Sequence, residues 1–278
     1  MDGVEVYKKQ RKDGSLVWRK MVVSIDDVVR HDFELEFDVL EDLQGLECVP
    51  GLASELKYTE GFPYFDMALV KGISLSGIFR VRKKLAEMQK KGKLTDIREE
   101  VAPLGNGILN LGETRFLSRI AYCFEEIHEK EVVHRDIKPG NLFVCYGGNI
   151  LVLDFGFASP LLDKPRTRIV GTPNYVSPEQ IRNFNDVDIR GDVYSLAVVA
   201  YVGFTGETPY KETKERGYSA VLDGHLKGDA DPVCELNPAV PRELSDIIAK
   251  GMALKPEDRY QTMEEFGRAL ESITMGGV

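Results

Sequence analysis

The side chains with the greatest chemical capacity lie in two short stretches near the middle of the chain, HRDIKPGN at 134–141 and DFG at 154–156. Asp136 can accept the proton of an attacking hydroxyl, and Lys138 can stabilise the charge of a phosphate in transit. The side-chain oxygens of Asn141 and Asp154 are the hard ligands that Mg²⁺ prefers. Together these groups are suited to phosphoryl transfer.

The spacing of the two stretches makes this interpretation specific. Asn141 lies five residues after Asp136, and Asp154 lies eighteen residues after it. The interval has room for two short strands around a diglycine turn, expected at Leu142–Cys145 and Ile150–Leu153. Alone, DFG would usually be a turn after a strand, and HRD would more often be a surface salt-bridge cluster. In this order and at this distance they predict a catalytic centre whose two metal ligands share one edge of a hairpin.

In this combination of residues, the chain resembles a protein kinase. Two further stretches carry the resemblance, GTPNYVSPE at 171–179, which is similar to the end of an activation segment, and KPEDRY at 255–260. The SPEQ letters at 177–180 and the KPEDRY stretch look most like the bacterial eukaryotic-like (Hanks-type) serine/threonine kinases. The resemblance runs from Gly3 to about Ile273.

The resemblance implies an α+β, bilobal fold, with a small antiparallel β-sheet and one helix in the first lobe and a larger, mainly helical second lobe. It implies a single kinase domain over residues 1–278, divided into lobes at 1–70 and 71–278. It also implies that ATP and Mg²⁺ are bound and that the γ-phosphate passes to serine or threonine hydroxyls of a protein substrate. Lys138 favours these acceptors, since tyrosine kinases usually place an arginine elsewhere in this loop.

The elements that position these groups begin with a small sheet. Strands are expected at Val4–Tyr7 and Leu16–Val23, with a polar turn between them. A helix should follow from Asp26 or Asp27 to Leu43, because the apolar residues at 33, 37 and 40 share one stripe at helical spacing. This helix and these strands form the expected first lobe.

Glu36 lies close to the apolar stripe of that helix. Because an unpaired buried carboxylate is unfavourable, Glu36 needs a cationic partner, and Lys20 is the obvious candidate. The resemblance implies the same pair, since kinases link a strand lysine of the small lobe to a glutamate on the next helix. An exposed strand lysine is the alternative interpretation of Lys20.

Trp18 is a departure from the family pattern, which normally has a small alanine there, over the adenine ring. Trp18 and Lys20 lie two residues apart, so strand alternation puts both side chains on one face. The tryptophan either restricts the nucleotide pocket or stacks across it, and both interpretations stay open.

The resemblance also assigns the remaining nucleotide contacts. Met67 would line the back of the adenine pocket, and the backbone of Ala68 and Val70 would hydrogen-bond the adenine. Residues 3–8 align with the end of the glycine-rich loop and the strand after it, so the first lobe is expected to lack most of that loop. Because the loop normally lays backbone N–H groups over the phosphates, its loss would weaken nucleotide binding.

In the second lobe the resemblance implies structural and regulatory roles. Glu179 would form a salt bridge with Arg259, and Asp192 would cap the backbone of the catalytic loop. Thr172 would contact the catalytic aspartate and lysine. Thr167 lies between two arginines and is either a phosphorylation site or a solvated loop residue.

Composition limits the other classes of function. The net charge of −9 argues against a nucleic-acid binder, and the basic run at 80–93 is read as the solvated face of a helix at 76–91. The cysteines and histidines share no ligand-like spacing, which favours reduced thiols in a cytoplasmic protein. The longest apolar run, at 196–204, is too short to span a bilayer, and no targeting segment is expected. Residues 92–112 are expected to be a surface insertion.

Two alternatives to an active protein kinase stay open. A shortened glycine-rich loop and Trp18 would suit a pseudokinase scaffold with weak or no phosphotransfer, although a scaffold has no need of the metal ligands Asn141 and Asp154. A phosphotransferase for a small metabolite would share the catalytic residues but generally lacks the 171–179 stretch. The expected partners are ATP and a protein substrate, with no nucleic acid and no membrane, and nothing indicates the oligomeric state.

Overall fold

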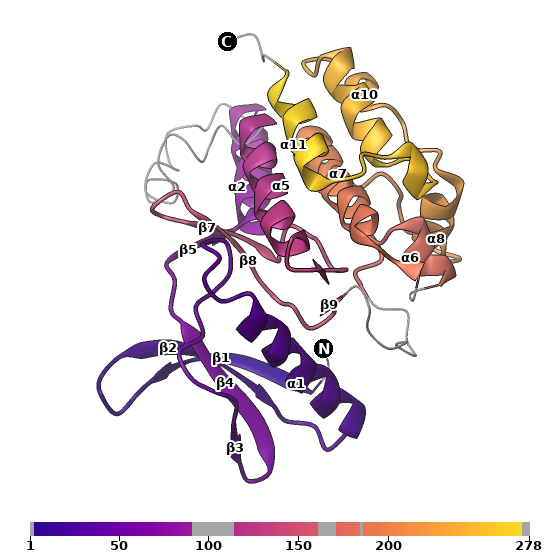
Figure 1. Ribbon diagram of the computed structural model, residues 1–278. Coiled ribbons are helices and arrows are strands. Elements are labelled where there is room, and N and C mark those ends of the chain that lie inside the picture. The colour runs from indigo at the N-terminus through magenta and orange to yellow at the C-terminus, as the bar shows by residue number, and fades with distance from the viewer. Residues whose placement is uncertain (1–2, 91–113, 161–170, 184–185, 274–278) are drawn as a thin grey trace.

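The computed structural model describes residues 3–90, 114–160, 171–183 and 186–273. They form two lobes, one built on an antiparallel sheet and a larger one built mainly from helices (Figure 1). This is the α+β architecture that the sequence predicted. Among the described helices, none combines the length and the apolar character that a membrane crossing requires.

The small lobe contains a four-stranded antiparallel sheet and one helix. The strand order is β1-β2-β4-β3, and the elements are β1 Val4–Gln10, β2 Leu16–Val22, α1 Asp27–Asp42, β3 Lys57–Thr59 and β4 Phe62–Ala68. The turn between β1 and β2 closes because Gly14 takes a φ of 85° and the Asp13 carboxylate accepts hydrogen bonds from Ser15. The predicted strands and turn are therefore present, with β1 running on to Gln10.

Helix α1 begins where the sequence predicted and is held on the sheet by aromatic packing. The Asp26 side chain caps its first turn by accepting a hydrogen bond from the Val28 N–H at 2.8 Å. Phe33 and Phe37 lie with their ring centroids 5.0 and 5.5 Å from that of Phe65 on β4. These contacts orient the helix so that its inward face includes the predicted apolar stripe.

The chain passes to the large lobe between Ala68 and Gly72. β4 ends at Ala68 because its pairing with β2 ends at the Val17–Ala68 pair. The next strand begins at Gly72 and joins a different sheet, pairing with a strand near Cys145.

The large lobe contains short strands near the small lobe and helices beyond them. The elements are β5 Gly72–Ser74, α2 Leu75–Lys90, α5 Thr114–His128, β6 Val132–Val133, β7 Leu142–Cys145, β8 Ile150–Val152, β9 Ser159–Pro160, α6 Pro178–Arg182, α7 Ile189–Thr205, α8 Tyr218–Lys227, α9 Val233–Leu236, α10 Arg242–Gly251, a 3₁₀ turn at Pro256–Asp258, and α11 Met263–Glu271. β7 and β8 are the hairpin predicted between the two catalytic stretches, and β5 pairs with β7.

Helix α7 lies at the centre of the large-lobe core. All its residues from Gly191 to Tyr201 are buried, and α5, α10 and α11 pack around it (Figure 1). A helix that is apolar on every side is stable only inside such a core. Gly251 lets α10 approach closely, since a Cβ there would lie 2.7 Å from the Cβ of Ala197. Helix α7 carries the buried carboxylate of Asp192 toward the catalytic loop.

Candidate active site

The loop 134–141 joins β6 to β7 and is fixed by a buried carboxylate. Asp192 is completely buried and accepts hydrogen bonds from the backbone N–H groups of His134 and Arg135 at 2.8 and 2.9 Å. His128 Nε2 lies 2.9 Å from the same side chain. Burial disfavours the charged carboxylate, but these hydrogen bonds outweigh burial and lower the pKa of Asp192. The predicted capping of the loop by Asp192 is therefore present.

His134 connects this loop to the DFG stretch. Its Nδ1 accepts a hydrogen bond from the Asp136 N–H at 3.2 Å, and its Nε2 lies 3.2 Å from the carbonyl oxygen of Leu153. A neutral imidazole with its proton on Nε2 satisfies both contacts. The ring also packs against Phe155, with the centroids 5.0 Å apart. The histidine thus orders the backbone around Asp136.

Asp136 is surrounded by three donors. Lys138 Nζ and Asn141 Nδ2 lie 2.5 and 3.0 Å from its Oδ2. The Thr172 hydroxyl donates to its Oδ1 at 2.8 Å and accepts from Lys138 Nζ at 2.9 Å. The predicted contact of Thr172 with the aspartate and the lysine is therefore present. Because a carboxylate has about four lone-pair sites, the three bonds leave an acceptor position on Oδ1.

Asn141 and Asp154 lie together at one end of the β7–β8 hairpin. Leu142 pairs with Val152, and the Leu153 N–H donates to the Asn141 carbonyl oxygen at 2.7 Å. Asp154 has a left-handed φ of 63°, a conformation that aspartate tolerates better than most residues, and its side chain is 41% exposed. The hairpin places both predicted metal ligands at the same edge.

The donor set of these two residues fits Mg²⁺. Asn141 directs its amide nitrogen to Asp136, so the amide oxygen is the atom left for another partner. Burial raises the pKa of Asp154, but Lys20 outweighs burial and lowers it to about 2, which keeps the carboxylate charged. No group of three or more metal-binding His, Cys, Asp and Glu side chains occurs in the described part of the chain. Mg²⁺ usually needs only one or two protein carboxylates, with phosphates and water completing its shell.

Lys20 joins the small lobe to this centre. Its Nζ lies 2.6 Å from Glu36 Oε1 and 3.0 Å from Asp154 Oδ1, and the Lys20 and Glu36 side chains are only 8% and 2% exposed. Burial disfavours the ammonium, but the two carboxylates outweigh burial and raise the pKa of Lys20. The predicted Lys20–Glu36 pair is present, and the interpretation of Lys20 as an exposed lysine is wrong.

A cavity of about 380 Å³ lies beside these residues. This volume is within the range of small-molecule sites, roughly 300–1,000 Å³. Lys20, Asn141 and Asp154 line it, together with the predicted nucleotide contacts Met67, Ala68 and Val70. Trp18 lines it as well, in agreement with its predicted place on the same face of β2 as Lys20.

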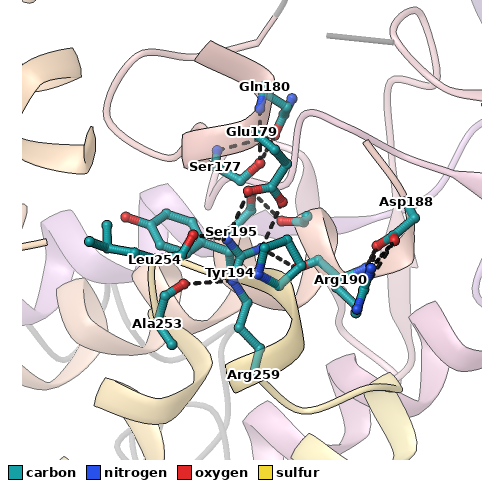
Figure 2. Close-up of polar contacts among 12 residues, drawn as sticks. Ser177, Glu179, Gln180, Asp188, Arg190, Tyr194, Ser195, Ala253, Leu254 and Arg259 are labelled. Atoms are coloured by element: carbon teal, nitrogen blue, oxygen red, sulfur yellow. Dashed lines mark hydrogen bonds and ion pairs between the residues drawn. The ribbon is translucent and has the colours of Figure 1, made fainter. Parts of the chain in front are cut away.

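A second charged cluster supports the end of the 171–179 stretch (Figure 2). The Arg259 guanidinium is fully buried and donates to both carboxylate oxygens of Glu179 at 2.7 Å. It also donates to the backbone carbonyls of Arg190, Ala253 and Leu254, at 2.9, 2.7 and 3.2 Å. The predicted Glu179–Arg259 salt bridge is therefore present and is anchored to the backbone.

Gln180 is a positioning residue that the sequence interpretation did not single out. Ser177 and Gln180 form a capping box at the start of α6, a pairing that the S-x-x-Q spacing indicates. The Gln180 amide also donates to the carbonyl oxygen of Arg135 at 2.8 Å, which ties α6 to the catalytic loop. Nothing in the sequence predicts that long-range bond. Phe143, which lines the cavity, was missed too, although strand alternation from Asn141 indicates it.

Two predicted features lie outside the described residues. They are the candidate phosphorylation site Thr167 and the insertion at 92–112.

Comparisons with known proteins agree with this geometry. A family described as "Protein kinase domain" matches residues 73–268. The chain is 44% identical over 145 residues to the tyrosine-protein kinase MasK of Myxococcus xanthus, 28% over 272 residues to the serine/threonine-protein kinase PknH of Mycobacterium bovis, and 32% over 234 residues to the probable serine/threonine-protein kinase PknB of Bifidobacterium longum. These matches cover 51%, 95% and 82% of this chain but 22%, 41% and 30% of the relatives, so the chain spans less than half of their length. These relatives are bacterial, as the resemblance implied. The chain therefore belongs to the protein kinase family.

Proposed function

We propose that the chain is an ATP- and Mg²⁺-dependent kinase that phosphorylates serine and threonine side chains of proteins. The observation that carries this proposal is the arrangement around Asn141. Its side chain lines the cavity with Lys20 and Asp154 and donates to Asp136 at 3.0 Å. A proton acceptor, a phosphate-binding cation and two hard oxygen ligands are thus neighbours, as phosphoryl transfer requires.

In the proposed reaction, Asp136 acts on the acceptor hydroxyl and Lys138 acts on the phosphoryl group that it receives. Asp136 orients the acceptor hydroxyl through the remaining acceptor site on Oδ1 and takes its proton. Lys138 is held between the Asp136 carboxylate and the Thr172 hydroxyl, so its ammonium stays close to the transferred phosphoryl group and stabilises its charge.

The nucleotide side is assigned to the other residues. Lys20, oriented by Glu36, would bind the α- and β-phosphates. Its ammonium already contacts one anionic group, the Asp154 carboxylate. Asn141 and Asp154 would hold Mg²⁺, which when bound neutralises charge on the phosphate oxygens. Met67 and the backbone of Ala68 and Val70 would contact the adenine.

The acceptor class is part of the proposal. The position of Lys138 beside Thr172 and Asp136 supports serine and threonine. The names of the relatives include both classes, since PknH and PknB are named serine/threonine kinases and MasK is named a tyrosine kinase. The assignment of residues 1–278 to one domain and the cytoplasmic location also remain predictions.

Labelled transfer tests this proposal. The purified chain is incubated with Mg²⁺, ATP labelled at the γ-phosphate and a generic basic protein, and the labelled amino acids are separated after acid hydrolysis. We expect phosphoserine and phosphothreonine, loss of the label when the metal is chelated, and recovery when Mg²⁺ is restored. Phosphotyrosine alone would contradict the acceptor class, and ATP binding without any transfer would favour a pseudokinase.

A further inference from the structure

The two lobes line the cavity in the same way. On β2, Trp18 and Lys20 lie two positions apart and both face the cavity. Asn141, immediately before β7, and Phe143, on β7, also lie two positions apart, and both line the cavity. On β2, a rise of about 3.3 Å per residue separates Trp18 from Lys20 by about 7 Å along the strand. Each lobe therefore contributes one such pair, a polar and an aromatic side chain two positions apart, among its other lining residues.

The polar members mark the phosphate end of the cavity. Lys20 contacts Asp154 at 3.0 Å, and Asn141 contacts Asp136 at 3.0 Å. Both contacts involve carboxylates that the proposed function places beside the phosphates or the acceptor.

The aromatic members lie toward the connection between the lobes. Trp18 pairs across the sheet with Met67, immediately before the connection at 68–71. The Phe143 ring lies against Gly72, immediately after it, where an added Cβ would come within 2.6 Å of the ring. The base of a nucleotide whose phosphates meet Lys20 would therefore occupy the space between these two rings.

The indole of Trp18 is open to such a ligand. It is 36% exposed, and no ring pair in the described part of the chain includes it. The cavity it lines keeps about 380 Å³, so the tryptophan does not fill the site. An exposed indole over an open cavity is stabilised when a flat apolar surface covers it.

We propose that Trp18 and Phe143 form an aromatic clamp that holds the planar base of the nucleotide between the two lobes. The clamp rests on the proposed function, because it specifies how the same cavity binds its nucleotide. Every base has a π-face, so stacking is tolerant of base identity. The clamp therefore sets affinity for planar heteroaromatic bases and does not by itself select adenine over guanine.

Tryptophan emission tests the clamp directly. Trp18 is the single tryptophan of the chain, so its fluorescence reports this residue alone. Titration with MgATP or MgGTP should change its emission, while tripolyphosphate, which has no base, should leave it unchanged. ATP binding detected by calorimetry without a change in emission would overturn the clamp.

Variants provide an independent measurement. Stacking on one base is strong enough that Trp18→Ala should weaken ATP binding about tenfold or more. Trp18→Phe should lose much less, and both variants should bind tripolyphosphate like the wild type. Phe143→Leu should weaken ATP binding in the same direction. Tyr58→Ala removes an exposed ring on β3 that hydrogen-bonds Glu34, so it is a matched control that should not change ATP affinity.

Different binding results would contradict the clamp and the proposed function. If Trp18→Ala binds ATP as tightly as the wild type or more tightly, the indole restricts the pocket and the clamp is wrong, while the ATP site stands. If neither the wild type nor Trp18→Ala binds ATP, although both remain folded by circular dichroism, the proposed function is wrong and the clamp with it.

Discussion

The two lobes hold their functional charges by different means. In the large lobe, Asp192 accepts two backbone N–H groups and Arg259 donates to three backbone carbonyls as well as to Glu179. In the small lobe, the hydrogen bonds of Lys20 described here go to two side chains, Glu36 and Asp154. The second of these belongs to the other lobe.

Because of this difference, we expect changes in the two lobes to affect different properties of the protein. Charges that are tied to the backbone fix the catalytic loop and the 171–179 stretch whether or not a ligand is present. The Lys20 contact crosses the cavity to an aspartate that is 41% exposed, so it depends on the relative position of the lobes and can be exchanged for a phosphate. Changes in the large-lobe clusters should therefore reduce stability first, and changes at Lys20 should reduce activity first.

The largest expected effect on stability is that of Arg259→Met. The change leaves Glu179, whose side chain is 12% exposed, without its cation, and such a loss costs about 3–5 kcal/mol in the free energy of unfolding. Denaturant unfolding measures it. The double variant with Glu179→Gln should lose less than the sum of the single changes, because both act on one contact. A change below about 1 kcal/mol would show that the cluster does not carry the stability of this lobe.

Lys20→Arg should change the free energy of unfolding less than Arg259→Met does, but it should clearly reduce catalysis. The guanidinium keeps the charge but differs in shape and reach, so kcat/KM should fall at least about tenfold. Glu36→Gln should give a loss of the same kind, with a double variant that is less than additive. Both single variants should unfold at denaturant concentrations closer to the wild type than Arg259→Met does. If Lys20→Arg has wild-type kinetics, the assignment of Lys20 to the phosphates is wrong.

The smallest effect is expected for Arg268→Ala, which is a matched control for Arg259→Met. Arg268 also pairs with a glutamate of the large lobe, Glu264, but the side chains are 69% and 46% exposed. Exposed pairs of this kind contribute about 0.2–1 kcal/mol at most, so unfolding should change little and activity should stay the same. A loss as large as that of Arg259→Met would show that burial is not what distinguishes the two pairs.

The sequence predicted the local elements well because their signals are local. The stripe of α1, the β7–β8 hairpin and the turn at Gly14 follow from periodicity and turn chemistry over a few residues. The Lys20–Glu36 pair was also predictable, since a glutamate beside an apolar stripe needs a buried cation. The resemblance supplied the longer-range pairs, Glu179 with Arg259 and Asp192 with the catalytic loop.

The features that the sequence did not predict depend on where separate segments meet. The bond from Gln180 to the Arg135 carbonyl joins residues 45 positions apart, and no local pattern indicates it. The end of β4 at Ala68 depends on where its antiparallel partner β2 begins, at Leu16. That Trp18 and Phe143 line one cavity depends on how the lobes are placed, although the face of each strand was predictable.

The most direct test of the account is phosphate transfer by Asp136→Asn compared with the wild type. The amide keeps the size of the side chain and its place beside Lys138 and Thr172, but it cannot take the proton of the acceptor hydroxyl. We expect transfer to serine and threonine to fall by about 10²–10⁴-fold, with ATP affinity and the unfolding transition close to those of the wild type. Equal labelling by the two proteins would contradict the assignment of Asp136 as the catalytic base, and with it the central claim.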